Sequence, residues 1–310
     1  MKKQSTVTKD LVMIYGDRDD GVIGIPALTV DGQVIEVSYF FGRKHPKNII
    51  AISSQAGCPM RCAFCELGAA RFARSLTAQE MRDQTELALE EAARYGFDRD
   101  KTPHKINVAN SGEPLLNTEL VGGLSLIGGL PKTIKVSTVF PDARIAWENF
   151  ERLAEYACGL KEQVVQIQIS LISTSEKERL SLSGGKVAGF EKIRQAAELW
   201  RSKNPQGRKI NLSLMLTDRM ACDIRGLSSL FPPRLFRLRL REYVPSSNGE
   251  SRGLRIVTPI RLSSLANEAQ ALGYEAGDWA SPTPTERKFG LAANAIRQQY
   301  LDMLKRAKGD

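Results

Sequence analysis

Three of the five cysteines lie within eight residues, and this spacing restricts the possible folds more than any other feature of the chain. Cys58, Cys62 and Cys65 follow the pattern C-x3-C-x2-C. A closed tetrahedral zinc site needs a fourth ligand, and neither His45 nor His104 is close in sequence. An iron–sulfur cluster held by three cysteines leaves one iron open for a ligand. The pattern therefore favours a [4Fe–4S] cluster, with a zinc knuckle or a disulfide plus a spare thiol as alternatives.

The chain after the cysteines alternates between predicted strands and predicted helices. The predicted strands are at 49–53, 105–110, 133–139, 164–171, 209–216 and 235–244. The predicted helices are at 77–95, 118–128, 142–158, 187–203, 221–230, 259–272 and 289–307. Strand–helix units of this kind predict a parallel sheet with right-handed crossovers. Six are too few for an eight-stranded barrel, so we expect an α/β fold, a partial (β/α)6 TIM-like barrel with its site at the carboxyl ends of the strands.

The chain before the cysteines is rich in β-branched and aromatic residues. Runs at 11–15, 22–30 and 33–41 predict strands, and Asp31-Gly32 between the last two is typical of a hairpin. We expect a small N-terminal β appendage over residues 1–47. The catalytic domain, with a C-terminal helical extension, is expected over residues 48–310.

The predicted barrel strands are apolar on one face and polar on the other. The sixth strand carries Arg237, Arg239 and Arg241 between leucines, and the strands near 165–171 and 212–217 alternate in the same way. Outward side chains of a barrel pack against helices, so the polar face should line the lumen. Because unpaired buried charge is costly, we expect polar ligands there, with the arginines binding an anionic substrate. The alternative is that the arginines face solvent on an edge strand or pair with helix carboxylates.

Charge and cysteine usage suggest the class of partner and the compartment. The net charge of +9 favours anionic partners such as nucleic acid, nucleotides or an acidic electron donor. No apolar run approaches the roughly 18 residues that a membrane span needs, and the N-terminus lacks the apolar core of a signal peptide. Cysteines without a disulfide pattern fit a reducing compartment, so we expect a cytoplasmic protein without a membrane partner.

The cysteine pattern, with Phe64 just before the last cysteine, resembles the radical S-adenosylmethionine (SAM) superfamily. In that superfamily the open iron binds the amino and carboxylate groups of SAM. An electron from the cluster cleaves SAM to a 5′-deoxyadenosyl radical, which abstracts hydrogen from a substrate. The resemblance also implies a low-potential reductant such as flavodoxin or ferredoxin.

Four stretches resemble, in order, landmarks of the RlmN/Cfr family of RNA adenine C-methyltransferases. They read SSQAGCPMRCAFCELG, SGEPLLN, VSTVFP at 136–141 and ISLIST at 169–174. The Gly-Glu of the second stretch lies at a predicted strand end, where glycine lets a ligand approach the backbone and a carboxylate can meet an ammonium group. By this resemblance SAM is contacted by six residues: Phe64, Gly112, Glu113, Pro114, Ser137 and Ser170.

The chain departs from that family at the residues that carry the methyl group. Phe289, in the stretch ERKFGLAAN, stands where the family has its C-terminal cysteine, and Ala51 stands where it has a second one. The family's N-terminal RNA-binding domain is not expected in the 57 residues before the first cluster cysteine. Lacking both cysteines, the chain is predicted not to methylate through a protein-bound methylene.

The remaining candidate residues have a structural alternative in each case. Cys222 could donate hydrogen to a substrate radical at the barrel mouth or pack as a small apolar side chain. Tyr243 could contact substrate or belong to a Pro-Ser-Asn-Gly turn. The sequence predicts a radical SAM enzyme that abstracts hydrogen from a small anionic substrate. The alternatives are an RNA-modifying enzyme with altered chemistry and a non-catalytic cluster- or SAM-binding protein.

Overall fold

The computed structural model describes residues 5–9, 15–17, 21–41, 48–96, 104–218, 220, 222–276 and 295–308, and its centre is one mixed sheet. Six neighbouring strands of that sheet are parallel, each bonded to the next. They are β5 (Asn48–Ile52), β8 (His104–Val108), β9 (Pro131–Thr138), β10 (Val164–Ile172), β11 (Ile210–Leu216) and β12 (Phe236–Glu242). Because β12 ends the sheet without pairing with β5, the barrel is open. The predicted partial (β/α)6 fold is confirmed.

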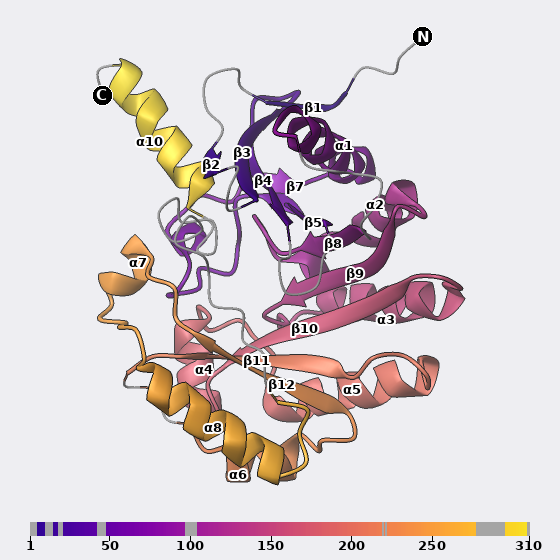
Figure 1. Ribbon diagram of the computed structural model, residues 1–310, viewed down its shortest axis with the longest axis vertical. Coiled ribbons are helices and arrows are strands. Elements are labelled where there is room, and N and C mark those ends of the chain that lie inside the picture. Colours follow the sequence, from indigo (N-terminus) through magenta and orange to yellow (C-terminus); the bar gives the residue numbers. More distant parts are fainter. Residues whose placement is uncertain are drawn as a thin grey trace.

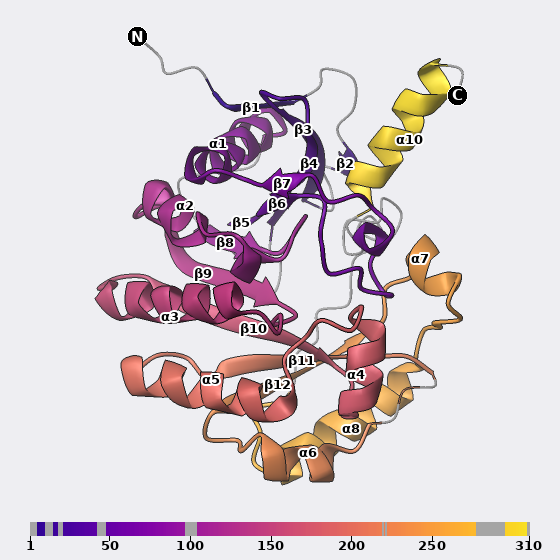
Figure 2. The ribbon, with the colours of Figure 1, turned by 180° about the vertical axis from the view of Figure 1, so that it is seen from behind.

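Helices follow the strands as the alternating pattern predicts. They are α1 (Ala78–Arg94), α2 (Leu120–Ile127), α3 (Arg144–Gly159), α4 (Glu176–Leu182), α5 (Phe190–Lys203), α6 (Ile224–Leu230), α7 (Ser247–Glu250), α8 (Pro259–Ala271) and α10 (Ile296–Lys308). Figure 2 shows α1, α2, α3 and α5 along one side of the strands, and Figure 1 shows the strands from the other side. The short helices α4 and α7 were not predicted, because the sequence of α4, EKERLSL, is mostly polar and the four residues of α7 are too few for an apolar periodicity.

The apolar residues of each strand face the helices, as alternation predicts. Ile106, Ile134, Ile167, Leu212 and Leu238 belong to one buried cluster that also holds the inner faces of the helices. The intervening polar residues of neighbouring strands lie in register on the opposite face, where Ser137, Gln168, Asn211 and Arg237 form one row. The two faces of the sheet therefore differ in polarity, and the polar face is the one left for a ligand.

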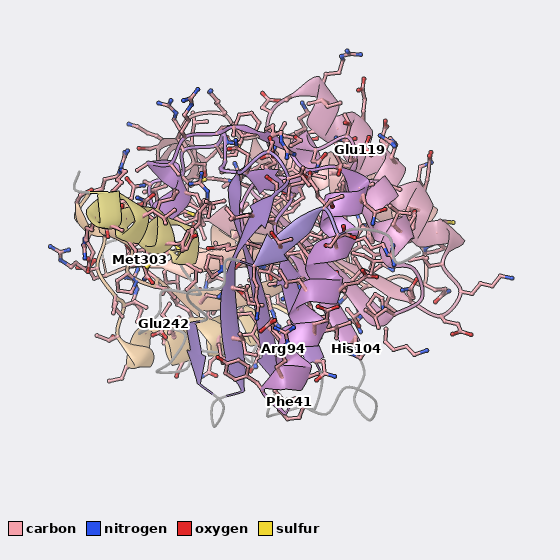
Figure 3. All side chains as sticks on the ribbon, turned by 90° about the horizontal axis from the view of Figure 1, so that it is seen from above. Phe41, Arg94, His104, Glu119, Glu242 and Met303 are labelled. Atoms are coloured by element: carbon pink, nitrogen blue, oxygen red, sulfur yellow. The ribbon has the colours of Figure 1, made fainter. Side chains whose placement is uncertain are left out.

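The N-terminal strands extend the same sheet instead of forming a separate one. β1 (Val7–Lys9), β2 (Tyr15–Asp17), β3 (Val22–Thr29) and β4 (Val34–Phe41) are antiparallel, and β4 pairs with β5. The predicted hairpin is present, with Gly32 at φ +76°, a value that favours glycine. Figure 3 shows α1 and α10 on opposite sides of these strands. Both faces of β3 and β4 are accordingly buried.

A buried carboxylate joins β4 to the start of α10. Glu36 is 1% exposed, and its Oε2 accepts the backbone N–H of Arg297 at 3.2 Å. Arg297 in turn donates its Nε–H to Val34 O at 2.8 Å. Burial raises the pKa of Glu36 from 4.5 to about 7, against the lowering effects of the Arg297 backbone N–H and charge. The carboxylate therefore caps the helix at a cost in desolvation.

Stability is expected to fall as pH rises through the window set by Glu36. The folded-state pKa lies above the unfolded value, so the contribution is fully present below about pH 4.5 and lost as pH rises through about 7. The loss is on the order of 3 kcal/mol. Urea unfolding at pH 5 and pH 8 should show a smaller difference for Glu36→Gln than for the unchanged protein. If stability changed equally between pH 5 and pH 8 in the two proteins, Glu36 would not be the group responsible for the pH dependence.

No helix in the described ranges is both long and apolar enough to cross a membrane.

Candidate functional site

The three cysteines lie in one loop at the carboxyl end of β5. A two-residue pairing of β6 (Gln55–Ala56) with β7 (Arg74–Ser75) closes this segment, residues 57–73, which we call the cysteine loop. Cys62 is buried, Cys58 and Cys65 are partly buried, and all three thiols are free of disulfides. The three cysteines belong to or pack against one small apolar cluster, together with Met60, Phe64, Leu116, Val139 and Val187.

The thiols are close enough to influence one another. The pKa of Cys58 is raised to about 12, mainly by burial and to a lesser extent by the charges of Cys65 and Glu113. Burial also raises the pKa of Cys62, with contributions from both other cysteines and from Glu113. In the described residues, no three Cys, His, Asp or Glu side chains converge as ligands of one metal ion. A cluster binds each thiolate through a different iron, so close but not convergent thiols fit it better than a single zinc ion.

Glu113 lies at the carboxyl end of β8, just before the short 3-10 helix η2 (Pro114–Leu116). It is 3% exposed, and its carboxylate accepts the Thr138 hydroxyl at 2.5 Å and the backbone N–H groups of Val139 and Leu115 at 2.9 and 3.1 Å. Burial raises its pKa to about 7, although these donors oppose the shift. A carboxylate has about four acceptor positions, so three bonds leave one for a further donor.

Position 112 requires glycine for a different reason from the predicted approach of a ligand to the backbone. Its φ is +107°, and a Cβ there would lie 2.6 Å from Gln55 Cβ and 2.7 Å from Ser54 Oγ. The close approach is to the chain that follows β5, where Gln55 Oε1 also accepts the Glu113 N–H at 2.9 Å. The glycine thus lets the chain after β8 pack closely against the residues that lead from β5 into the cysteine loop.

Buried polar atoms without partners lie on the polar face of the sheet. Within the described residues, no hydrogen bond reaches Asn107 Oδ1, Ser137 Oγ or Asn211 Oδ1. These residues come from β8, β9 and β11, and Ser170 on β10 is partly buried on the same face. Buried polar groups in native proteins are nearly always bonded, so these atoms are consistent with a polar ligand between the strands.

Arg179 was not predicted, and it is the charged centre of the site. It lies on α4, is 1% exposed, and donates from Nη1 to Ala188 O at 3.0 Å and from Nη2 to Val139 O at 2.6 Å. Burial lowers its pKa to about 10, while the charges of Glu176, Cys62 and Glu113 favour the cation. Its Nε has no partner among the described residues. Because its contacts are distant in sequence, no local pattern could have indicated it.

Cations surround a cleft of about 520 Å³ beside Cys58. Arg61, Arg71 and Lys186 line it together with Phe72, which is 39% exposed. Among the described residues, none of these three cations has a carboxylate partner. A second cleft of about 300 Å³ shares Arg71 and Phe72 and reaches Arg297. The opening beside the cysteines is therefore basic, with one exposed aromatic ring.

The predicted arginine row is partly corrected. β12 is an edge strand, and Arg237 forms an ion pair with Glu275 at 2.5 Å. For this residue the alternative prediction applies, in which the arginine lies on an edge strand and pairs with a carboxylate instead of a substrate. Glu275 also binds Lys209 at 2.9 Å. Arg239 and Arg241 are partly buried on the same face of β12. The partner of Arg237 follows α8 in the chain, 38 residues away, and could not be read from the strand pattern.

Tyr243 takes the second of its two predicted roles, as part of the turn that follows β12. It is 0% exposed, and its hydroxyl oxygen accepts the Ser246 N–H at 2.9 Å. With no exposed surface it cannot contact a substrate in this structure, and it stabilises the turn after β12. Pro114 is buried in η2, and Phe64 packs partly buried against the cysteines.

Cys222 packs on the helix side of the sheet. It is partly buried against the main apolar core, and burial raises its pKa to about 12. Its charged neighbours are Arg261, Glu268, Asp223 and Glu178, none of them in the cysteine loop. This placement agrees with the alternative prediction, in which Cys222 packs as a small apolar side chain. Cys158 is exposed at the end of α3, and Phe289 lies outside the described residues.

Comparison with known proteins identifies the fold and its relatives. The Radical SAM superfamily matches residues 52–222. "Dual-specificity RNA methyltransferase RlmN" of Magnetococcus marinus is 40% identical over 97 residues, 31% of this chain and 26% of that protein. The protein of the same name in Desulfotalea psychrophila is 32% identical over 167 residues, 52% of this chain and 43% of that protein. The matched part thus spans less than half of either relative.

A solved structure supports the same architecture. The radical SAM methyltransferase from Sphaerobacter thermophilus superposes with a TM-score of 0.71 at 22% identity, over 88% of this chain and 76% of that one. At this identity the likeness concerns the fold.

Proposed function

This chain belongs to the radical SAM superfamily, and we propose that Cys58, Cys62 and Cys65 hold a [4Fe–4S] cluster at which SAM is reductively cleaved. The observation that carries the proposal is the set of three thiols that form no disulfide and lie close to one another beside the Glu113 carboxylate. When bound, cluster and SAM supply a 5′-deoxyadenosyl radical. Arg179, buried beside Cys62 and Glu113, compensates the negative charge that thiolates bring to this apolar environment.

The chain's own residues bind and orient SAM in this proposal. The remaining acceptor position of Glu113 suits the SAM ammonium group, and a cation there would favour the ionised carboxylate despite its burial. Ser137 Oγ and Asn211 Oδ1, which lack partners among the described residues, are suited to the polar parts of SAM, as is Ser170. Pro114 and Phe64 are proposed to supply apolar contacts beside these groups.

The substrate is proposed to be anionic and to enter beside Cys58. Three cations without carboxylate partners among the described residues surround that cleft, together with the exposed ring of Phe72. Arg239 and Arg241 are proposed to contact the part of the substrate that lies over the sheet. The reaction is hydrogen abstraction from this substrate. The net charge of +9 suits an acidic reductant of the flavodoxin or ferredoxin type and a cytoplasmic setting.

RNA is a second candidate substrate, favoured by the names of the relatives. Both are RNA methyltransferases, and the basic cleft suits phosphate groups as well as a small anion. The matched segments cover only part of those proteins, so their RNA substrate is carried over as a proposal. A modification of RNA by hydrogen abstraction would share the first step with the favoured function.

The first step is tested by anaerobic reconstitution of the cluster, reduction with dithionite and addition of SAM. We expect 5′-deoxyadenosine, detected by mass spectrometry. An intact cluster with bound SAM and no such product would contradict the proposal. An RNA oligonucleotide and a pool of small phosphorylated or carboxylated metabolites, each deuterium-labelled, then distinguish the two substrate classes by which one transfers label to the product.

Arg71→Glu is expected to weaken binding of an anionic ligand at the cleft by about tenfold, because it replaces an attractive charge with a repulsive one. Fluorescence anisotropy with a labelled RNA oligonucleotide, at two salt concentrations, measures the effect. Arg144→Glu on α3 is the matched control, since its side chain is 91% exposed and its partner is Glu148. Equal losses for the two variants would mean that the cleft is not the binding site.

A further inference from the structure

The loop that follows the last barrel strand contacts the cysteine loop, which follows the first. β5 and β12 are the outermost parallel strands and do not pair with each other. The turn at residues 246–250, which contains α7, lies beside the 3-10 helix η1 (Glu66–Gly68) of the cysteine loop in both Figure 1 and Figure 2. We call residues 246–250 the α7 turn. Side chains of this turn bridge the open edge of the barrel at its carboxyl end.

Two side chains of the α7 turn bind the carbonyls of four consecutive residues. Asn248 Nδ2 lies 3.0 Å from Cys62 O and 3.1 Å from both Ala63 O and Cys65 O, 183 to 186 residues away in sequence. Ser246 Oγ donates to Phe64 O at 3.1 Å. The two amide hydrogens of Asn248 are shared among three acceptors. The stretch from the second to the third cluster cysteine is thus bonded throughout to one turn.

The α7 turn is itself fixed from within. The Ser246 N–H donates to the buried Tyr243 hydroxyl at 2.9 Å, and Ser246 Oγ accepts the Gly249 N–H at 3.0 Å. On the other side of the contact, the Ser247 N–H donates to Glu66 Oε1 at 2.5 Å. The donors of the α7 turn are therefore held in position by bonds within the chain after β12 as well as by the bond to Glu66.

Glycine at position 68 shows how tightly the two segments are packed. A Cβ there would lie 2.1 Å from Cys62 O and 2.6 Å from Asn248 Nδ2. Real Cβ atoms essentially never come within 3.0 Å of another group, so a larger residue would separate the amide from the carbonyl. The contact between Asn248 and the cysteine loop depends on this missing side chain.

We propose that Asn248 is a positioning residue for the cluster: it fixes the backbone that carries Cys62 and Cys65, and so links the end of the last strand to the cluster site. The inference rests on the proposed function, because it assumes that these cysteines hold a cluster. The loop has little regular structure, so without these bonds its ligands would sample many orientations. Fixing the carbonyls reduces the ordering that cluster binding would otherwise require.

Asn248→Ala is expected to increase the rate of cluster loss to an iron chelator by roughly tenfold, because two to three hydrogen bonds of modest net strength disappear. Asn248→Asp should have a larger effect, since it turns a carboxylate toward three carbonyls. Gly68→Ala should reproduce the defect by displacing Asn248. Ser251→Ala is the matched control, because Ser251 Oγ donates only to Asn248 O within the turn, at 2.8 Å. Absorbance of the cluster follows its loss.

Hydrogen exchange of the cluster-free protein separates this inference from the proposed function. Peptides covering residues 58–68 should exchange faster in Asn248→Ala, whereas peptides covering α3 and α5 should be unchanged. That result needs no cluster and would stand even if the cluster proposal failed. Unchanged exchange at 58–68, or cluster loss that merely follows a global loss of stability in urea unfolding, would overturn the positioning role.

Discussion

Cys62→Ala is expected to abolish 5′-deoxyadenosine formation, with product falling to the level of protein without cluster. Cys62 is the most buried of the three thiols, at 7% exposed, and it lies between the other two in the loop. A cluster held by three thiolates that loses one of them loses both an iron–sulfur bond and its protection from solvent. The measurement is mass spectrometry of the product, alongside iron content and cluster absorbance.

Cys158→Ala is the matched control for this prediction. Its thiol is exposed in the last turn of α3, and the same chemical change there should leave both iron content and product unaffected. Without the cluster, the free energy of unfolding of Cys62→Ala should lie within about 2 kcal/mol of that of the unchanged protein, since only a small side chain is removed. Full product from Cys62→Ala would contradict the assignment of the cluster to these cysteines.

Arg179→Met is expected to produce the largest loss of stability at the site. The guanidinium binds two buried carbonyls, Ala188 O and Val139 O, and is close enough to Glu113 and Cys62 for their charges to favour the cation. Methionine fills similar space but leaves both carbonyls without these donors and Glu113 without a nearby positive charge. Charge-assisted hydrogen bonds contribute about 1.5–3 kcal/mol each, so we expect a loss of roughly 3–5 kcal/mol in the free energy of unfolding.

Urea unfolding of the cluster-free protein, followed by circular dichroism, measures this loss. Arg179→Lys should lie between Met and the unchanged protein, because lysine keeps the charge but lacks the planar fork that reaches both carbonyls. Arg144→Met serves as the exposed control and should cost less than about 1 kcal/mol. If Arg179→Met were as stable as that control, Arg179 would not hold the loop after β9 to α4.

The charge of Arg179 also affects the proposed cluster. Removing a buried cation near thiolates makes addition of an electron less favourable, so the cluster in Arg179→Lys should be easier to reduce than in Arg179→Met. This comparison would distinguish an electrostatic role from a packing role. A buried arginine beside three cysteines and a carboxylate is consistent with the proposed cluster, because its positive charge favours reduction.

The sequence by itself determined the features that depend on short-range spacing. The C-x3-C-x2-C pattern placed three thiols in one loop because four and three residues of chain keep side chains close together. Alternation in β10, β11 and β12 predicted which side chains face the helices, because successive residues of a strand point to opposite faces. The six parallel strands followed from the order of strand and helix patterns, and Asp31-Gly32 fixed the hairpin.

Only the tertiary structure decided the contacts between residues far apart in the chain. It paired Arg237 with Glu275, bonded Asn248 to Cys62, and brought Arg179 near Cys62 and Glu113. It also joined the N-terminal strands to the barrel sheet and bonded the first turn of α10 to Glu36. Such contacts have no sequence period, because they depend on how whole elements pack. That is why the cysteines could be found in the sequence, whereas the residues that position and neutralise them could not.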